Sequence, residues 1–379
     1  MVLALANAGI PEMGLMRKCL VVSAVNLNEG GPLTILRDCL SSAIQLLPPE
    51  WDIFALVHDK KLIDLPRVKL IEIPQAKRSW LRRLYYEWID FKKISLELKP
   101  HLWLSLHDIT PRVVAQRQIV YCHNASPFYN LSWREAWLEP NLWLFNKFYG
   151  YLYAILIQRN YLVVVQQEWL RNEFEQMSKD LSVVVAHPSI KLSVGTQHTV
   201  SSDQKVIFFY PALARVFKNF EIIFDAAKLL MDRGLNGFEI RVTLKGDENR
   251  YAKLLYKNYD SIPVLKFIGL QSREEMAQQY QEAAAVIFPS KLESWGLPIT
   301  EAKAYKKPIL VADMPYAHET IGTYERVSFF PPTDAFILAD LMQAVIEKRW
   351  QPVGARKDEP LPPFAHNWDE LWHLMTEGL

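Results

Sequence analysis

The stretch Phe288–Asp313, FPSKLESWGLPITEAKAYKKPILVAD, carries the clearest structural pattern in the chain. It continues the apolar run 285–288, crosses a short loop and enters a segment that opens near Pro298 and closes on two lysines before a second apolar run, 308–311. Proline near the first helical position and cations in the last turn are ordinary helix punctuation. Strand, glycine-containing loop, helix and strand form the repeating unit of a parallel sheet, so the stretch predicts an α/β fold.

The same alternation extends outward through the whole chain. Short, continuous runs rich in Val, Ile and Leu alternate with segments of helical period such as 34–47, 220–233 and 273–284. Continuous apolar runs predict strands that are buried on both faces, as in parallel sheets. Seven runs and then six predict two doubly wound, Rossmann-like sheets. The expected strands are 19–25, 53–58, 69–73, 102–106, 119–122, 162–165 and 183–186 in the first sheet, and 206–210, 238–244, 264–268, 285–288, 308–311 and 327–330 in the second.

The length of 379 residues also suits two domains, because single hydrophobic cores stop growing beyond about 250–300 residues. The most polar stretch between strands, 191–204, predicts the linker. We therefore expect a loose leader over 1–16, a first Rossmann-like domain over 17–198, a second over 199–350 and a crossover segment over 351–379 that ends in a short amphipathic helix.

Composition and missing motifs exclude several classes of protein. The net charge is +1, which gives no global field to attract nucleic acid. The three cysteines, Cys19, Cys39 and Cys122, have neither disulfide nor zinc spacing and suggest buried thiols in a reducing compartment. No apolar segment is long enough to span a bilayer. The chain also lacks G-x-G-x-x-G after a strand, G-x-S-x-G and D-x-D, which disfavours a nicotinamide enzyme, an acyl hydrolase and a D-x-D metal site.

Two glutamates flank the loop and helix of the opening stretch. A glycine-containing loop that leads into a helix at the carboxyl edge of a parallel sheet is suited to binding phosphate. Glu293 in the loop and Glu301, expected in the first helical turn, are placed to accept hydrogen bonds from sugar hydroxyls on either side of that phosphate. The alternatives remain open: Glu301 as a partner of the helix dipole, and Glu293 as a solvated loop residue.

At this point the sequence resembles a known family. P-S-x-x-E-x-W-G-L-P-x-x-E-A resembles the E-x7-E signature of family-4 retaining glycosyltransferases, which have the two-Rossmann GT-B fold. The resemblance implies that Glu293 contacts the donor sugar and Glu301 the nucleotide ribose. It implies that the backbone of Ser294, Trp295, Gly296 and Leu297 holds the distal phosphate.

Other residues follow in the order of that family. Lys218 and Arg215 resemble the basic loop that clamps the donor diphosphate, although the usual Gly-Arg after the strand is absent and Arg215 fits a surface residue equally. Gly246 resembles the small-residue turn near the nucleobase, with a plain turn glycine as the alternative.

In the first half, Gly30 and Gly31 follow the first strand and resemble the loop that faces the donor diphosphate. His123 lies where the family often carries a histidine that reaches the donor sugar, with a surface or capping histidine as the alternative. Residues 107–108 and 166–168 also follow strands and are candidates for the acceptor side.

Residues 77–99 interleave basic and aromatic side chains. This pattern suits either an anionic membrane surface or a long helix that packs on the sheet with solvated cations. Single-stranded nucleic acid is disfavoured because no recognition motif accompanies it.

The resemblance implies a metal-independent, cofactor-free retaining hexosyltransferase of the polysaccharide-biosynthesis type. Its donor would be a nucleotide-diphosphate sugar, UDP- or GDP-linked, and its acceptor a hydroxyl of a glycan or a lipid-linked glycan. The expected location is the cytoplasm, or the inner face of the membrane as a peripheral protein. Two alternatives remain: a nucleotide-sugar epimerase or phosphorylase on the same fold, and a catalytically silent nucleotide-sugar-binding protein.

Overall fold

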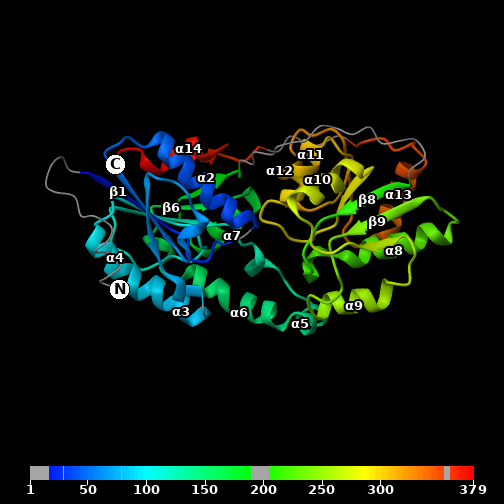
Figure 1. Ribbon diagram of the computed structural model, residues 1–379, viewed down its shortest axis with the longest axis horizontal. Coiled ribbons are helices and arrows are strands. Elements are labelled where there is room, and N and C mark those ends of the chain that lie inside the picture. Colours follow the sequence, from blue (N-terminus) through cyan, green and yellow to red (C-terminus); the bar gives the residue numbers. More distant parts are fainter. Residues whose placement is uncertain (1–16, 29, 78, 189–204, 354–358) are drawn as a thin grey trace. The chain divides into compact units, whose positions relative to one another are not determined.

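The computed structural model describes residues 17–28, 30–77, 79–188, 205–353 and 359–379. The chain divides into two compact units (Figure 1). The first comprises 1–125, 148–189 and 360–379, and the second comprises 126–147 and 190–359. The expected leader 1–16 and linker 191–204 lie outside the described residues.

The first unit is built on an 8-stranded sheet whose strand pairs are all parallel. Its order is β14-β7-β6-β5-β4-β1-β2-β3. This doubly wound arrangement places the switch in strand order between β1 and β4. The strands are β1 Lys18–Ser23, β2 Trp51–Val57, β3 Val68–Glu72, β4 Leu102–Ser105, β5 Arg117–Cys122, β6 Leu162–Val165, β7 Val183–Ala186 and β14 Phe364–Ala365.

The second unit contains a 6-stranded parallel sheet in the order β10-β9-β8-β11-β12-β13. The switch in strand order lies between β8 and β11, which pair directly. The strands are β8 Val206–Tyr210, β9 Phe238–Val242, β10 Leu265–Phe267, β11 Ala285–Phe288, β12 Ile309–Ala312 and β13 Val327–Phe330. Every expected strand is present, and the α/β prediction is confirmed.

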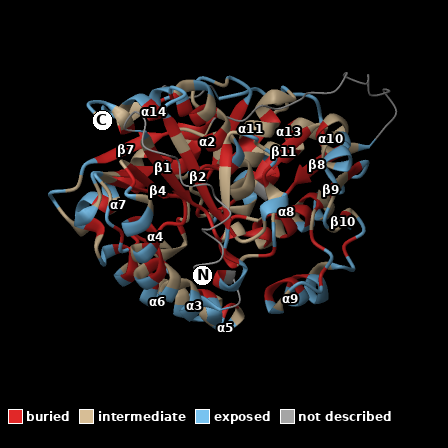
Figure 2. Ribbon diagram, turned by 60° about the vertical axis from the view of Figure 1, so that its left-hand side comes forward, coloured by how far each residue is buried: buried red, intermediate tan, exposed pale blue. Residues whose placement is uncertain are grey.

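Helices cover both sheets, and the strands between them are buried (Figure 2). The helices of the first unit are α2 Gly30–Leu46, α3 Trp80–Tyr85, α4 Phe91–Leu98, α7 Glu168–Met177 and α14 Trp368–Thr376. Those of the second unit are α5 Trp133–Leu138, α8 Phe220–Asp232, α9 Arg250–Tyr259, α10 Arg273–Glu282, α11 Leu297–Ala304, α12 Pro315–Ile321 and α13 Ala335–Ile346, while α6 Pro140–Ala154 crosses the boundary. Among the described helices, none is both long and apolar enough to cross a bilayer.

One part of the chain differs from the expected domain boundaries, and one part of the expected crossover segment can be located. Residues 126–147, expected in the first domain, belong to the second unit. Residues 360–379 return to the first unit, where Phe364 and Ala365 pair with β7 and α14 packs on α2. The segment 126–147 joins a unit that lies further along the chain, and no local pattern reveals this. The three cysteines are free and buried, and burial raises the pKa of each thiol above its usual value.

The expected long helix over 77–99 is interrupted. A π-helical segment, Tyr86–Asp90, separates α3 from α4. Within it, the Glu87 carboxylate is fully buried and accepts a hydrogen bond of 2.7 Å from Arg83 Nε. The interpretation of this helix as packed with solvated cations is therefore wrong for Arg83, because its charge is used to pair a buried carboxylate.

Candidate active site

The loops that follow β8 and β11 meet where the strand order of the second sheet reverses. In doubly wound sheets this carboxyl edge is where ligands bind. The loop after β8 ends in a 3-10 turn, Val216–Lys218, and the loop after β11 leads into α11. A hydrogen bond of 2.7 Å from the Lys291 backbone N–H to the Phe217 carbonyl joins the two loops.

Lys218 and Glu293 form a direct ion pair at this edge. Both side chains are mostly buried, and the Lys218 ammonium also lies over the rings of Phe217 and Phe288, 5.5 and 5.9 Å from their centroids. The structure thus brings together two residues that sequence analysis assigned to the donor site from segments 75 positions apart.

Asn219 fixes the position of Lys218. Its backbone is left-handed, with φ 57°, and it ends the 3-10 turn where α8 begins. Its side-chain amide donates to the carbonyls of Pro289, at 3.2 Å, and Pro332, at 2.8 Å. The Tyr210 hydroxyl donates to the Lys218 carbonyl at 2.8 Å. Lys218 therefore sits on a loop that is held to two neighbouring segments, and sequence analysis did not identify Asn219.

Gly296 allows the β11 loop to turn into α11. Its φ is 85°, and an added Cβ would lie 3.2 Å from Ile299 Cδ1 and 3.5 Å from Phe288 Cε1. No side chain caps the start of α11 at this residue. In the first turn of α11, Pro298 has no N–H and the Ile299 N–H donates to the Gly296 carbonyl at 2.9 Å. The helix start therefore suits an anion mainly through its partial positive charge and the N–H groups of the loop that precedes it.

Three further residues of the predicted phosphate loop adjoin Gly296. Ser294 and Trp295 precede it, and Leu297 opens α11. The Trp295 ring is held in place because its Nε1 donates to Thr300 at 3.0 Å, while its carbonyl accepts a hydrogen bond from Thr320.

Glu301 lies in the second turn of α11 instead of the expected first turn. Its carboxylate accepts a hydrogen bond of 2.6 Å from the Tyr280 hydroxyl, and burial raises its pKa. The helix dipole acts mainly on charges in the first turn. Because Glu301 lies beyond that turn, interaction with the dipole is a weaker explanation of this residue than the sequence suggested.

Arg215 is engaged by a carboxylate of the segment that sequence analysis had placed in the first domain. Its Nε lies 3.5 Å from Glu139 Oε1. Burial raises the pKa of Glu139, and the Arg215 charge opposes that rise. Arg215 is thus not a free surface cation. Its backbone carbonyl accepts a hydrogen bond of 2.9 Å from the Lys218 N–H, but among the described residues its guanidinium pairs with Glu139 and not with Glu293.

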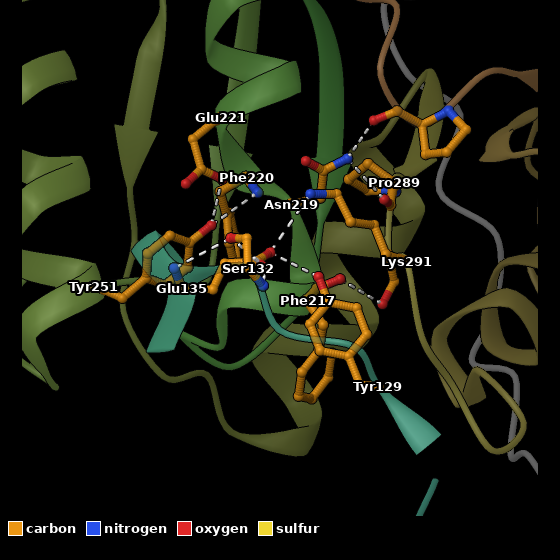
Figure 3. A network of polar contacts seen from close by, with 12 residues as sticks. Tyr129, Ser132, Glu135, Phe217, Asn219, Phe220, Glu221, Tyr251, Pro289 and Lys291 are labelled. Carbon is orange, nitrogen blue, oxygen red and sulfur yellow. Dashed lines mark hydrogen bonds and ion pairs between the residues drawn. The ribbon is translucent and has the colours of Figure 1, made fainter. Parts of the chain in front are cut away.

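A network of polar residues that sequence analysis missed surrounds these loops (Figure 3). Glu135 accepts hydrogen bonds from Tyr129, at 2.7 Å, and from Ser132, and forms an ion pair of 3.7 Å with Lys291. Burial alone would raise the pKa of Glu135, but these hydrogen bonds and Lys291 lower it below its usual value.

Glu221 has the opposite environment within the same network. It lies in the first turn of α8 and accepts a hydrogen bond from the Tyr251 hydroxyl, and burial raises its pKa. The S-x-x-E capping pattern at Ser132–Glu135 was a readable helix signal. The proximity of Glu135 to Lys291 could not be predicted from the sequence, because these two residues lie more than 150 positions apart.

Gly246 occupies a turn that only glycine fits. Its φ is 99°, and an added Cβ would lie 2.6–2.8 Å from three atoms of Tyr256. Its N–H donates to Glu248 at 2.9 Å. These contacts within the chain explain the glycine without a ligand and favour the turn interpretation.

In the first unit, the predicted residues follow the strands at the carboxyl edge of the sheet. Gly30 and Gly31 open α2 after β1. His123 follows β5, and its backbone N–H donates to Asp108 Oδ1 at 2.9 Å. The His123 ring Nδ1 lies 3.9 Å from the same oxygen, and the ring is mostly buried. The Asn124 N–H also donates to Asp108 Oδ1, at 3.1 Å, so the Asp108 carboxylate holds the His123 loop in place.

The other acceptor-side candidates make contacts inside the first unit. His107 is fully buried with its Nδ1 3.2 Å from Glu87. Gln166 donates to the Tyr121 hydroxyl at 3.3 Å, and Glu168 pairs with Arg171 at 3.0 Å. These contacts are typical of a structural role. Within the described ranges, no group of three or more His, Cys, Asp or Glu side chains is arranged to hold a metal ion.

Comparison with known proteins agrees with this architecture. Residues 196–358 match the family model described as "Glycosyl transferases group 1". This part of the chain is therefore similar to a glycosyltransferase group 1 domain, and the chain has the fold of two Rossmann-like domains that GT-B glycosyltransferases share. No curated protein sequence matches the chain.

Three solved glycosyltransferase-fold structures illustrate the similarity. Sucrose-phosphate synthase from Thermosynechococcus elongatus is 14% identical with a TM-score of 0.64, over 88% of this chain and 90% of that one. WaaG, a glycosyltransferase involved in lipopolysaccharide biosynthesis, is 11% identical with a TM-score of 0.63, over 86% and 90%. The Anabaena protein HepE in complex with UDP and glucose is 14% identical with a TM-score of 0.57, over 86% and 89%.

Proposed function

We propose that the protein is a retaining, metal-independent glycosyltransferase of family 4 that moves a sugar from a nucleotide-diphosphate donor to an acceptor hydroxyl. One observation carries the proposal: Lys218 and Glu293 are paired at the carboxyl edge of the second sheet, beside the uncapped start of α11. A cation, a carboxylate and a helix N-terminus are the groups that a diphosphate bonded to a sugar requires.

In the proposed reaction the bond between the anomeric carbon and the diphosphate breaks, and a bond to the acceptor oxygen forms on the same face. The transition state resembles an oxocarbenium ion, so stabilisation of the leaving group dominates. Lys218 and the start of α11 neutralise the departing diphosphate. The proton of the acceptor hydroxyl passes to an oxygen of the departing diphosphate. The reaction therefore needs no side chain as general base.

The two glutamates hold the donor on either side of the phosphates. When the donor binds, its phosphate replaces the Glu293 carboxylate as the partner of Lys218. Glu293 then accepts hydrogen bonds from the sugar hydroxyls. Glu301 accepts them from the ribose, with Tyr280 orienting the carboxylate. In the first unit, His123 and the backbone at Gly31 are the residues proposed to bind substrate.

The nucleotide of the donor is proposed to be UDP or GDP. HepE, which shares the fold, is known in complex with UDP and glucose, and this supports a nucleotide-sugar donor. WaaG belongs to lipopolysaccharide biosynthesis, and this supports a glycan or lipid-linked glycan as the acceptor.

We further propose that the enzyme works in the cytoplasm as a peripheral protein on an anionic membrane surface. The exposed apolar side chains of the interrupted helix support this: Leu81 is 73% exposed, and Trp80, Tyr85 and Ile89 are also exposed. Arg82 is the exposed cation beside them. Aromatic and basic side chains on one surface bind the lipid headgroup region.

The first test is thermal unfolding of the protein with UDP, GDP, ADP, CMP and dTDP, without added metal. A nucleotide at about 100 times its dissociation constant stabilises the folded state by ~2.7 kcal/mol, a shift of several degrees. A shift with one nucleotide identifies the donor class. No shift with any of them would favour a catalytically silent protein.

A second test separates a transferase from an epimerase or phosphorylase. Nucleotide release is measured with and without glycan acceptors, and only a transferase shows release that rises with acceptor hydroxyls. The Glu293→Ala variant should lose sugar transfer. If it transfers sugar as fast as the wild type, the proposed site is wrong.

A further inference from the structure

The loop after β8 is short of positive charge for a diphosphate. It lacks the Gly-Arg pair expected after this strand, and its arginine, Arg215, is paired with Glu139. Lys218 is then the remaining cation of the loop. A nucleoside diphosphate carries two to three negative charges, so a single ammonium leaves much of that charge unbalanced.

Lys291 is close to this loop. It follows β11 in the chain and is two positions before Glu293. Its backbone N–H donates to the carbonyl of Phe217, the residue before Lys218, at 2.7 Å. Figure 3 shows its side chain alongside Phe217 and Asn219. The Lys291 side chain is 32% exposed, so solvent and ligands reach it.

The pairing of Lys291 leaves room for a ligand. Its ammonium lies 3.7 Å from Glu135 Oε1, which is longer than a hydrogen bond. An ammonium has three N–H donors, so this pair offsets charge without using the donors. Glu135 itself is fixed by Tyr129 and Ser132.

We infer that Lys291 is the second cation that binds the diphosphate of the nucleotide, and that Glu135 is its counter-ion until the nucleotide binds. The inference rests on the proposed function and extends it. Lys218 and Lys291 contact the diphosphate from the loops after β8 and β11. Glu135 competes with the phosphate for Lys291, because both are anions that attract the same ammonium.

The two residues can be tested with variants that keep the fold. Lys291→Ala removes the ammonium of a partly exposed side chain, and Lys291→Arg keeps the charge. Glu135→Gln removes the negative charge but keeps the capping box, because glutamine also occupies this position of the motif. The matched control is Lys253→Ala, since Lys253 is an exposed lysine of the same unit on α9.

The experiment is calorimetric titration of the full chain with UDP and GDP, and with uridine and guanosine as ligands that lack phosphate. For the diphosphate that binds, Lys291→Ala should weaken affinity about tenfold, which corresponds to ~1.4 kcal/mol. The nucleoside affinity should change less than about twofold, and Lys253→Ala should match the wild type. Lys291→Arg should retain most of the affinity, and Glu135→Gln should tighten diphosphate binding about threefold, since a competing anion has been removed.

Different results overturn different conclusions. If Lys291→Ala binds the diphosphate as tightly as the wild type, or loses the nucleoside equally, Lys291 does not bind phosphate and the inference is wrong. If Lys291→Ala does not fold, Glu135→Gln decides alone: unchanged or weaker diphosphate binding overturns the inference. If the wild type binds none of the diphosphates, the proposed function falls and this inference falls with it.

Discussion

Replacing Gly246 by alanine should destabilise the second unit by more than the strain of the backbone alone. Gly246 has φ 99°, and its missing Cβ would lie 2.6 Å from Tyr256 Cδ2, 2.7 Å from Cγ and 2.8 Å from Cβ. A change of rotamer moves the ring but not the Cβ of Tyr256, so the side chain cannot swing clear. The backbone of the turn or of α9 must move instead.

The expected cost has two parts. A non-glycine residue with positive φ costs about 1–2 kcal/mol, and overpacking a filled site costs about 1–3 kcal/mol. Gly246→Ala should therefore lower the free energy of unfolding by about 2–5 kcal/mol. Gly234→Ala is the matched control, because Gly234 has φ 76° in the same unit but no atom within 4 Å of an added Cβ. It should show the first part alone.

The assay is urea unfolding followed by far-UV circular dichroism, with hydrogen exchange of the β9 amides to assign the transition to the second unit. The difference between the two variants measures the contact with Tyr256. If Gly246→Ala costs no more than Gly234→Ala, the close approach does not constrain this turn. The glycine would then have to be explained by a ligand.

Three further predictions concern charge. Lys218→Ala should lower the rate of sugar transfer about 10²–10³-fold in a steady-state assay, the usual loss for one group that stabilises a leaving charge; a smaller loss than tenfold would remove Lys218 from the site. Arg83→Ala should cost about 3–5 kcal/mol in urea unfolding because it removes the arginine that pairs the buried Glu87 and leaves only His107 beside that carboxylate, whereas Arg82→Ala should stay within about 0.5 kcal/mol; equal effects would contradict the buried pair. Because burial raises the pKa of Glu301, the folded protein binds a proton more tightly than the unfolded chain, so stability should fall as the pH rises from about 4.5 through the raised pKa. Glu301→Gln should flatten this part of the pH–stability curve. An unchanged curve would show that Glu301 is not the group whose raised pKa causes the loss of stability.

Burial within the first unit explains why the basic segment 77–99 was only partly predictable. Interleaved aromatic and basic residues indicated an amphipathic helix, and α3 and α4 are helical. Burial alone would raise the pKa of Glu87, but Arg83 and His107 lower it, so this carboxylate stays charged inside the unit. Glu87 lies in the π-helical turn Tyr86–Asp90, and no periodicity in the sequence indicates such a turn.

Sequence alone determined the α/β fold, the two sheets and the carboxyl-edge position of Lys218 and Glu293. Continuous apolar runs and helix punctuation are local, so each strand could be located from its own residues. Tertiary structure alone decided that 126–147 joins the second unit, that Glu139 holds Arg215 and that Glu135 stands opposite Lys291. Such pairs join segments that are far apart in the chain. Their charges come together only when the strands pair into the sheet and the loops at its edge pack against each other.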